Sequence, residues 1–155
     1  MNTTQEYAEE LIEALLAELG LEATRRDEAW AIAGPAGVEL VVRATPEGAI
    51  VTATLADMES AAAECREAVA AFLQRAQAEL RLVEAGVDEN AASLEARADG
   101  EELEVELGRA IHATARACRL LVRETQALLR PDLAEVYLQH HHSVVSAGRR
   151  RSRIH

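Results

Sequence analysis

Three consecutive histidines, in the stretch QHHHS from Gln139 to Ser143, are the first candidates for chemistry in this sequence. Imidazole nitrogens bind Zn²⁺ and other transition metals, so a histidine cluster raises the question of a metal site. Consecutive residues of a helix point about 100° apart, and His140, His141 and His142 therefore cannot converge on one ion. His112 lies far away in the sequence, on the next helical pattern toward the N-terminus. We predict that no metal is bound and that these histidines lie on the surface or pack against neighbours.

Cysteines and paired carboxylates are the other residue types that carry catalysis. Cys65 and Cys118 stand far apart, without a C-x-x-C motif, and both fall on apolar positions of helical patterns. This placement predicts two buried, reduced thiols. Glu102, Glu104 and Glu106 alternate along an expected strand with no electrophile beside them, which favours a solvated face over acid–base chemistry.

No known catalytic motif is present in the chain. It has no glycine-rich phosphate loop, no G-x-S-x-G elbow and no H-E-x-x-H pair. We predict that the protein is not an enzyme, has no catalytic residues and needs no cofactor. A small enzyme that uses His112 and a carboxylate in a pocket between a helix and the sheet is the weakest alternative.

Charge is distributed unevenly along the 155 residues, whose formal net charge is −11. Residues 1–148 hold twelve of the sixteen arginines and all 27 acidic residues, which gives this part −15, whereas four arginines fall within residues 149–155. Such an acidic body repels nucleic acid and anionic lipid and suits basic or apolar polypeptide partners. For the basic end we expect contact with the protein's own acidic body or no ordered role. The polar N-terminus and the lack of a long apolar run predict a soluble, cytoplasmic protein.

Helix and strand patterns alternate along the chain and predict an α+β fold. Thr3 and Glu6 have the spacing of a capping box, and leucines then recur at helical intervals up to Gly20. β-branched residues crowd the stretch GVELVVRATPEGAIVTATL, around a Pro-Glu-Gly turn, which indicates a hairpin. The expected strands are 29–33, 38–44 and 49–55.

The second half of the chain is expected to contain two long helices and a further hairpin. An apolar stripe predicts a helix over 60–85, longer than a domain of this size needs, so that part of it packs on a partner chain. Asp99-Gly100 is typical of a hairpin turn between strands. The expected elements are strands 92–98 and 102–107, a helix over 109–129 stopped by Pro131, and a short helix over 132–142. We divide the chain into a domain (1–130), a helical extension (131–148) and a flexible Arg-rich tail (149–155).

The order helix, three strands, long helix, hairpin, helix resembles that of the class I type III secretion chaperones, the Tir-chaperone-like family. The resemblance covers roughly Tyr7 to Leu129 and is carried by EELIEALLAELGL, by GVELVVRATPEGAIVTATLADM and by LEARADGEELEVELGRAIHATARAC. The chain length and the extension from Pro131 are most similar to the broad-specificity export-control chaperones of plant-pathogen secretion systems.

The resemblance implies a homodimer that binds the unfolded N-terminal segment of secreted effectors without ATP. The dimer would keep the effectors export-competent and deliver them to the secretion apparatus, with the secretion ATPase as a further possible partner. It implies that the dimer interface lies on the second helix, at Ala68, Val69, Phe72, Leu73, Ala76 and Leu80. It implies that effectors are bound at Leu11, Leu15, Leu19, Trp30, Val38, Leu40, Val42 and Ile50. In the alternative interpretation Leu11, Leu15, Leu19, Val38 and Leu40 are only the core, with the first helix covering the sheet. A second alternative for function is a bacterial regulator or adaptor of related fold that acts through protein or nucleic-acid contacts of its Arg-rich tail.

Overall fold

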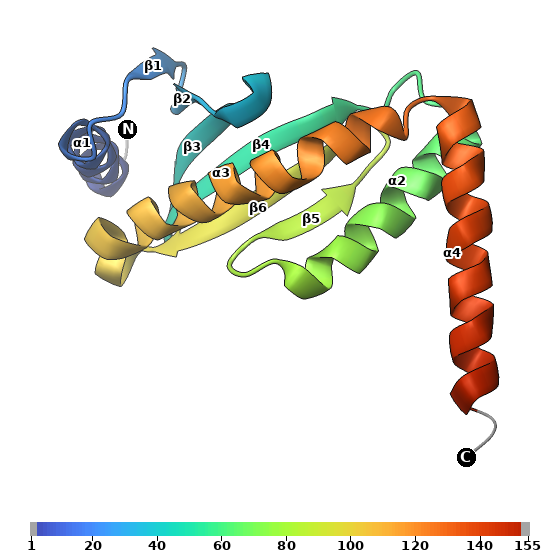
Figure 1. Cartoon of the computed structure of the whole chain (residues 1–155). Helices are drawn as coiled ribbons and strands as arrows, with labels where there is room; N and C mark the ends of the chain where they lie inside the picture. The colour runs from blue at the N-terminus through green and yellow to red at the C-terminus, as the bar shows by residue number, and fades with distance from the viewer. Residues whose placement is uncertain (1–2, 153–155) are drawn as a thin grey trace.

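The computed structural model describes residues 3–152 and contains four α-helices and six β-strands in that range (Figure 1). The elements are, in order, α1 (Thr3–Glu18), β1 (Ala23–Arg26), β2 (Ala29–Ala33), the short 3-10 helix η1 (Pro35–Gly37), β3 (Glu39–Thr45), β4 (Gly48–Asp57), α2 (Ala63–Ala76), η2 (Gln77–Glu79), β5 (Glu84–Val87), β6 (Ala91–Asp99), η3 (Gly100–Glu102), α3 (Leu103–Ala127) and α4 (Pro131–Ser152). The predicted α+β class is confirmed.

The six strands form one antiparallel sheet in the order β1-β2-β3-β4-β6-β5. Two-residue turns join its first strands: Arg26 pairs with Ala29 across one turn, and Thr45 pairs with Gly48 across the predicted Pro-Glu turn. The strands predicted over 29–33, 38–44 and 49–55 are present as β2, β3 and β4. β1 was not predicted, because its sequence ATRR lacks the apolar alternation that marks a half-buried strand.

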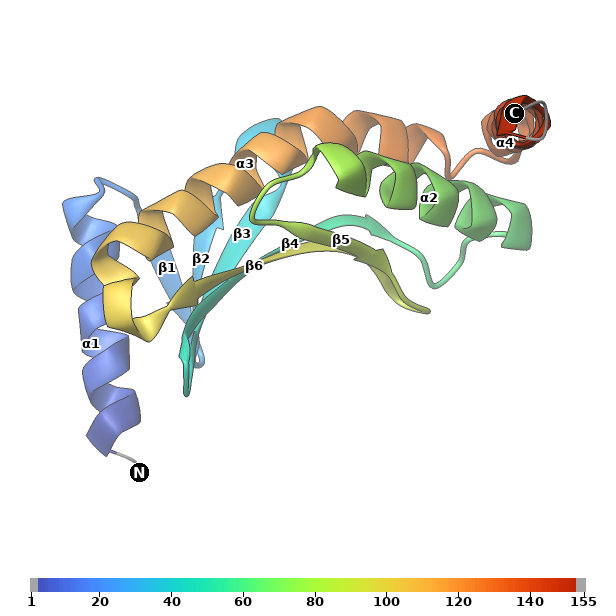
Figure 2. The ribbon, with the colours of Figure 1, turned by 90° about the horizontal axis from the view of Figure 1, so that it is seen from below.

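The hydrophobic core lies between one face of the curved sheet and the helices. Figure 2 shows α2 and α3 on the same side of the sheet, with no helix on the opposite, concave side. The buried side chains alternate along each strand, as at Trp30 and Ile32, at Leu40 and Val42, and at Leu94 and Ala96. Together with Ile12 and Leu16 of α1 and Leu107 of α3 they form one cluster.

Helix α1 ends where the sequence predicts. Gly20 has a φ of 74°, a backbone conformation that favours glycine. The N–H of Gly20 donates to the carbonyl of Ala17, and the N–H of Leu21 donates to that of Leu16, both at 3.0 Å. This pair of bonds is the Schellman motif, which satisfies carbonyl groups at the end of the helix.

The long helix predicted over 60–85 is wrong. α2 has only 14 residues, and η2 and a loop then lead into strand β5, which includes residues assigned to that helix. The side chain of Gln77 explains the reversal, since its Nε2 donates to the Val83 carbonyl at 2.9 Å and its Oε1 accepts from the Ala85 N–H at 2.7 Å. Leu82, with a φ of 68°, turns the chain back. Alanine and leucine favour a helix locally, but tertiary packing overrides that preference here.

The hairpin predicted at Asp99-Gly100 is also wrong. Strand β6 ends at Asp99, and η3 and α3 follow without a second strand. The Asp99 carboxylate accepts from the Glu101 N–H at 3.0 Å, and the Glu106 carboxylate accepts from the Asp99 N–H at 2.7 Å. These bonds start a helix in which Leu103 and Leu107 are buried four residues apart. The alternation of glutamates over 102–106 therefore belongs to a helix.

Helix α4 begins at Pro131, the residue that the sequence predicts as a stop for the preceding helix. α3 ends at Ala127, a three-residue link follows, and Pro131 occupies the first position of α4, where its missing N–H costs nothing. The backbone of α4 is helical to Ser152, so the helix is longer than the predicted extension over 131–148 and includes the first residues of the predicted tail. Residues 153–155 of that tail lie outside the described part.

Candidate functional site: the open face and free edge of the sheet

Most of the residues proposed to bind effectors lie inside the chain. Trp30, Leu40 and Val42 are 2% exposed or less, and Leu15 and Val38 are also buried. The remaining three are on or near the surface: Leu11 and Ile50 are half-buried, and Leu19 is exposed. The burial of Leu15, Val38 and Leu40 favours the alternative interpretation, in which they are core residues, whereas Leu11 and Leu19 are not buried.

The apolar face of α2, proposed as a dimer interface, is occupied by the chain itself. Ala68, Val69 and Leu73 are buried, and Phe72, Ala76 and Leu80 are half-buried. The Phe72 ring meets the Tyr137 ring of α4 edge to face, with ring centroids 6.2 Å apart. The chain's own α4 thus covers much of this face.

The histidines on α4 point in different directions, as their spacing requires. His141 stacks on Tyr137, with ring centroids 6.1 Å apart, whereas His142 Nε2 lies 3.8 Å from the Glu67 carboxylate. His112 of α3 is exposed. In the part of the chain that the structure describes, no three potential metal ligands converge.

Both thiols are buried and reduced, as predicted. The Cys65 thiol lies 3.4 Å from the Leu129 carbonyl, and burial raises its pKa. Burial raises the pKa of Cys118 to about 11, which keeps this thiol protonated at neutral pH. Neither cysteine has the lowered pKa of a nucleophile.

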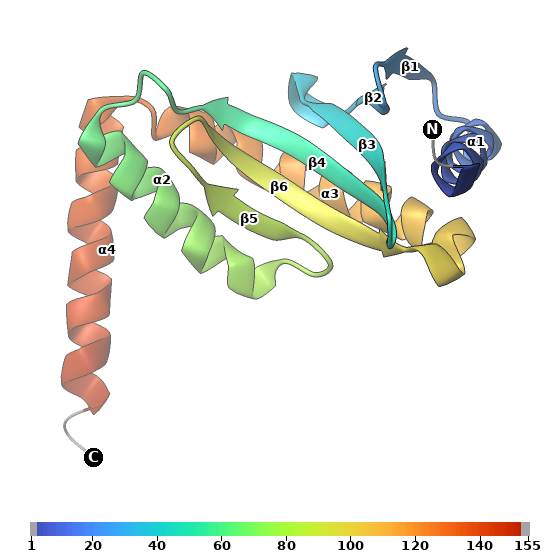
Figure 3. The same ribbon diagram turned by 180° about the vertical axis from the view of Figure 1, so that it is seen from behind.

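The concave side of the sheet, which we call the open face, has no helix packed on it (Figure 3). The strand register places Arg26, Ala29, Arg43, Ile50 and Arg97 in one row across β1, β2, β3, β4 and β6. Three arginines thus share one row in an otherwise acidic body. A neighbouring row consists of the smaller or polar residues Thr24, Ala31, Val41, Thr52 and Glu95.

The arginines of this row differ in how far their charge is compensated. Arg26 pairs with Glu39 at 2.8 Å and Arg97 with Glu95 at 3.3 Å, both on exposed side chains. Within residues 3–152, Arg43 makes no ion pair. Arg26 and Arg43 help to line a hollow on the open face, together with the carboxylates of Asp27, Glu28 and Glu39. The hollow therefore offers charges of both signs beside small apolar side chains.

The two edges of the sheet differ in the hydrogen-bond partners of their outward backbone groups. At β5 the amide of Gln77 occupies the outer Val83 carbonyl and the outer Ala85 N–H, in place of a neighbouring strand. At β1 the two-residue turn makes Arg26 the hydrogen-bonded partner of Ala29, so by alternation Ala23 and Arg25 direct their backbone N–H and C=O away from β2. In the described part of the chain no hydrogen bond occupies these outer groups of β1.

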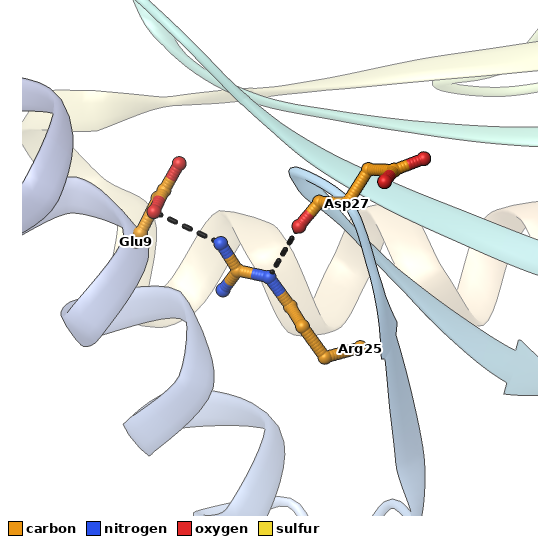
Figure 4. Close-up of polar contacts among 3 residues, drawn as sticks. All are labelled: Glu9, Arg25 and Asp27. Carbon is orange, nitrogen blue, oxygen red and sulfur yellow. Dashed lines mark hydrogen bonds and ion pairs between the residues drawn. The ribbon is translucent and has the colours of Figure 1, made fainter.

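Arg25 fixes β1 against the rest of the domain. Its guanidinium donates to the Glu9 carboxylate of α1 and to the Asp27 carbonyl in the turn, both at 2.9 Å (Figure 4). The guanidinium also lies 4.1 Å from the centre of the Trp30 ring, in cation–π contact. The free edge is therefore held in place by side chains on its inner side.

Sequence reasoning missed the arginine row because a row across a sheet depends on the register of strands far apart in sequence. A weak signal was present, since Arg97 is an exposed position between two buried ones and Arg43 an exposed position next to the buried Val42. β1 itself carried no such signal.

The chain matches no protein-family model, and no curated protein matches it. Among solved structures it is similar to YbjN, described as "a putative transcription regulator from E. coli", with a TM-score of 0.56 and 16% identity over 76% of this chain and 90% of that one. At this identity the likeness shows the fold alone. Over residues 3–152, none of the helices has the length and apolar character needed to cross a bilayer.

Proposed function

We propose that this protein is a non-enzymatic binding protein that holds an extended segment of another polypeptide along β1 and the adjoining open face. One observation carries the proposal: the sheet has one face without helices, and beside it the outward backbone groups of Ala23 and Arg25 at the β1 edge have no hydrogen-bond partner in the described part of the chain, so that a strand can be added there. Edge addition recognises backbone, so it accommodates many sequences.

The geometry indicates what such a segment looks like. Backbone hydrogen bonds to Ala23 and Arg25 contribute about 0.5–1.5 kcal/mol each, and alternate side chains of the segment lie over the open face. There they meet Arg26 and Arg43 together with Asp27, Glu28 and Glu39, a surface of mixed charge. A segment of four to six residues in extended conformation fits this surface, and an acidic side chain is favoured only where it reaches Arg43.

Within this class, we propose that the partners are secreted effectors and that the protein is a type III secretion chaperone. The order of elements, with β1 added to the predicted set, and the acidic body support this assignment. In this role the protein binds the unfolded N-terminal segment of an effector, keeps it export-competent and delivers it to the secretion apparatus.

A second candidate is a regulator or adaptor, and the structural likeness to YbjN favours it. In this role the partner at β1 belongs to a regulatory protein. Direct binding of nucleic acid is opposed by the charge of −15 on residues 1–148.

Affinity purification from the native cells, followed by mass spectrometry, separates these candidates. Captured proteins are then presented as arrays of overlapping 15-residue peptides, to find whether a short segment is bound. Effector N-terminal segments support the chaperone role, and a segment of a regulatory protein supports the second candidate. Partners bound only as folded domains, with no peptide retained, contradict the proposal.

Matched proline variants test the binding mode. Ala23→Pro removes an outward N–H at β1, and Val87→Pro removes one at the opposite edge, β5. We expect at least a fivefold loss of peptide affinity for Ala23→Pro and less than a twofold change for Val87→Pro, with circular dichroism as the control for folding. Equal effects of the two variants contradict addition at β1.

A further inference from the structure

A groove runs between α2 and α3, on the side of the sheet opposite the open face. The two helices lie on the same face of the sheet and run in opposite directions (Figure 2). Two hollows follow the groove: one lies between α2, α3 and α4, and the other lies between α3 and the loop after η2. Leu80 and Leu120 line both hollows, so the groove continues from one to the other.

Apolar side chains line much of the groove. Leu120 is 60% exposed, whereas the other three leucines of α3 are buried. Leu80 is half-buried. The remaining apolar lining consists of Phe72, Ala76, Leu121 and Tyr137 in the hollow next to α4, and of Ala113 and Ala117 in the other hollow. An exposed leucine in a continuous apolar groove is typical of a surface that binds another protein.

Charged side chains border the groove and differ in sign along it. The hollow next to α4 is lined by two carboxylates and one guanidinium, from Glu79, Glu124 and Arg75. The other hollow is lined by two guanidiniums and one carboxylate, from Arg81, Arg116 and Glu79. Within residues 3–152 none of these five side chains makes an ion pair. The groove is therefore net negative at its α4 end and net positive at its other end.

We propose that this groove binds an amphipathic helix of a partner protein. Ala117 and Leu121, which line different hollows, are one turn apart on α3. Apolar side chains four residues apart on the partner helix therefore enter the hollows on either side of Leu120. The lining residues of α3 extend from Ala113 to Glu124, which is about 17 Å and matches about three turns of a partner helix. An amphipathic helix fits an apolar groove with charged borders because its apolar stripe is flanked by polar side chains.

The charges along the groove indicate the direction of the partner helix. A helix carries partial positive charge at its N-terminus and partial negative charge at its C-terminus. The partner helix therefore lies with its N-terminus at Glu124, antiparallel to α3. An acidic side chain in its last turn then meets the guanidinium groups of Arg81 and Arg116. Because the groove and the open face lie on opposite sides of the sheet, this interaction does not depend on what β1 binds.

Binding of helical peptides tests the groove. A display library of amphipathic helical peptides of about 15 residues is selected against the full chain, and the affinity of the selected peptides is measured by fluorescence anisotropy. Leu120→Glu is expected to weaken binding at least tenfold, whereas Val105→Glu, at a 53% exposed side chain of α3 that lines neither hollow, leaves it unchanged. Equal affinity for the two variants, or no helical peptide that binds below 100 µM, overturns the proposal. So does a dimer of this chain whose mass falls to the 16.8 kDa of one chain in Leu120→Glu, because a second copy then occupies the groove.

Charge reversal and a spin label test the direction of the helix. Arg81→Glu combined with Arg116→Glu is expected to weaken the selected peptides at least fivefold and to favour peptides with lysine in the last turn. A nitroxide at the peptide N-terminus is expected to broaden the NMR signals of Glu124 rather than those of Ala113. The reverse broadening, or equal affinity after charge reversal, overturns the proposed direction. The helical peptides are expected to bind Ala23→Pro as they bind the wild type, so that failure of this groove and failure of strand addition at β1 are distinguishable.

Discussion

Gln77 is predicted to keep β5 in the sheet and to close that edge. Its amide makes one donated and one accepted hydrogen bond to β5 backbone, at 2.9 and 2.7 Å, from a half-buried position at the end of α2. Gln77→Ala removes both bonds and leaves the Val83 carbonyl and the Ala85 N–H unpaired.

The cost follows from the number of bonds. Two neutral hydrogen bonds contribute about 0.5–1.5 kcal/mol each, so we expect the variant to lose about 1–3 kcal/mol of unfolding free energy. For a chain of this length that corresponds to a fall in Tm of about 2–4 °C per kcal/mol. Gln77→Glu keeps the acceptor for Ala85 but faces the Val83 carbonyl with a carboxylate oxygen, so it is expected to cost at least as much.

Urea unfolding and amide hydrogen exchange are the measurements. Gln74→Ala removes the same side chain from an exposed position on α2 and is expected to change stability by less than about 0.5 kcal/mol. The Ala85 amide is expected to lose protection in Gln77→Ala only. Equal stability of the two variants, with Ala85 still protected, would refute the assignment.

Further predictions concern the inner side of β1, the buried thiol and the turn between β3 and β4. Trp30 is the only tryptophan, so Arg25→Ala is expected to shift its fluorescence to the red and to cost about 1–2 kcal/mol, whereas Arg26→Ala leaves the spectrum unchanged. Burial raises the pKa of Cys118 to about 11 from 9.0, so this thiol ionises first in the unfolded chain. The free energy of unfolding therefore falls as pH rises from 9 to 11, by up to about 2–3 kcal/mol. Urea titrations at pH 8 and 10.5 check this, and Cys118→Ala is expected to reduce the difference in stability between the two pH values. A Cβ at Gly48 would lie 2.1 Å from a backbone carbonyl oxygen of β6, so Gly48→Ala is expected to unfold at least 10 °C earlier in a thermal melt, and an unchanged Tm would contradict the turn geometry.

Local signals in the sequence were sufficient for the first half of the fold except β1. Gly20 ends α1 and the Pro-Glu turn joins β3 to β4 because both depend on residues adjacent in the chain. The buried cysteines followed from apolar periodicity in the same way.

The second half could not be read locally. The end of α2 depends on Gln77 meeting β5 through space, and the start of α3 depends on Glu106 reaching back to Asp99. Two of these errors cancelled in the predicted order of elements. The strand predicted over 102–107 is the start of α3, and the unpredicted strand β5 before β6 keeps the number of strands after α2 at two. The candidate site was missed for the same reason, since the row with Arg43 and Arg97 exists only once register is known.

Hydrogen exchange of the complex tests the central claim most directly. The protein is compared alone and bound to the tightest 15-residue peptide from the array of captured partners. Addition of a strand at β1 predicts that the Ala23 and Arg25 amides exchange at least tenfold more slowly in the complex, with Val87 at the opposite edge unchanged. A complex in which the β1 amides exchange as fast as in the free protein would contradict the account.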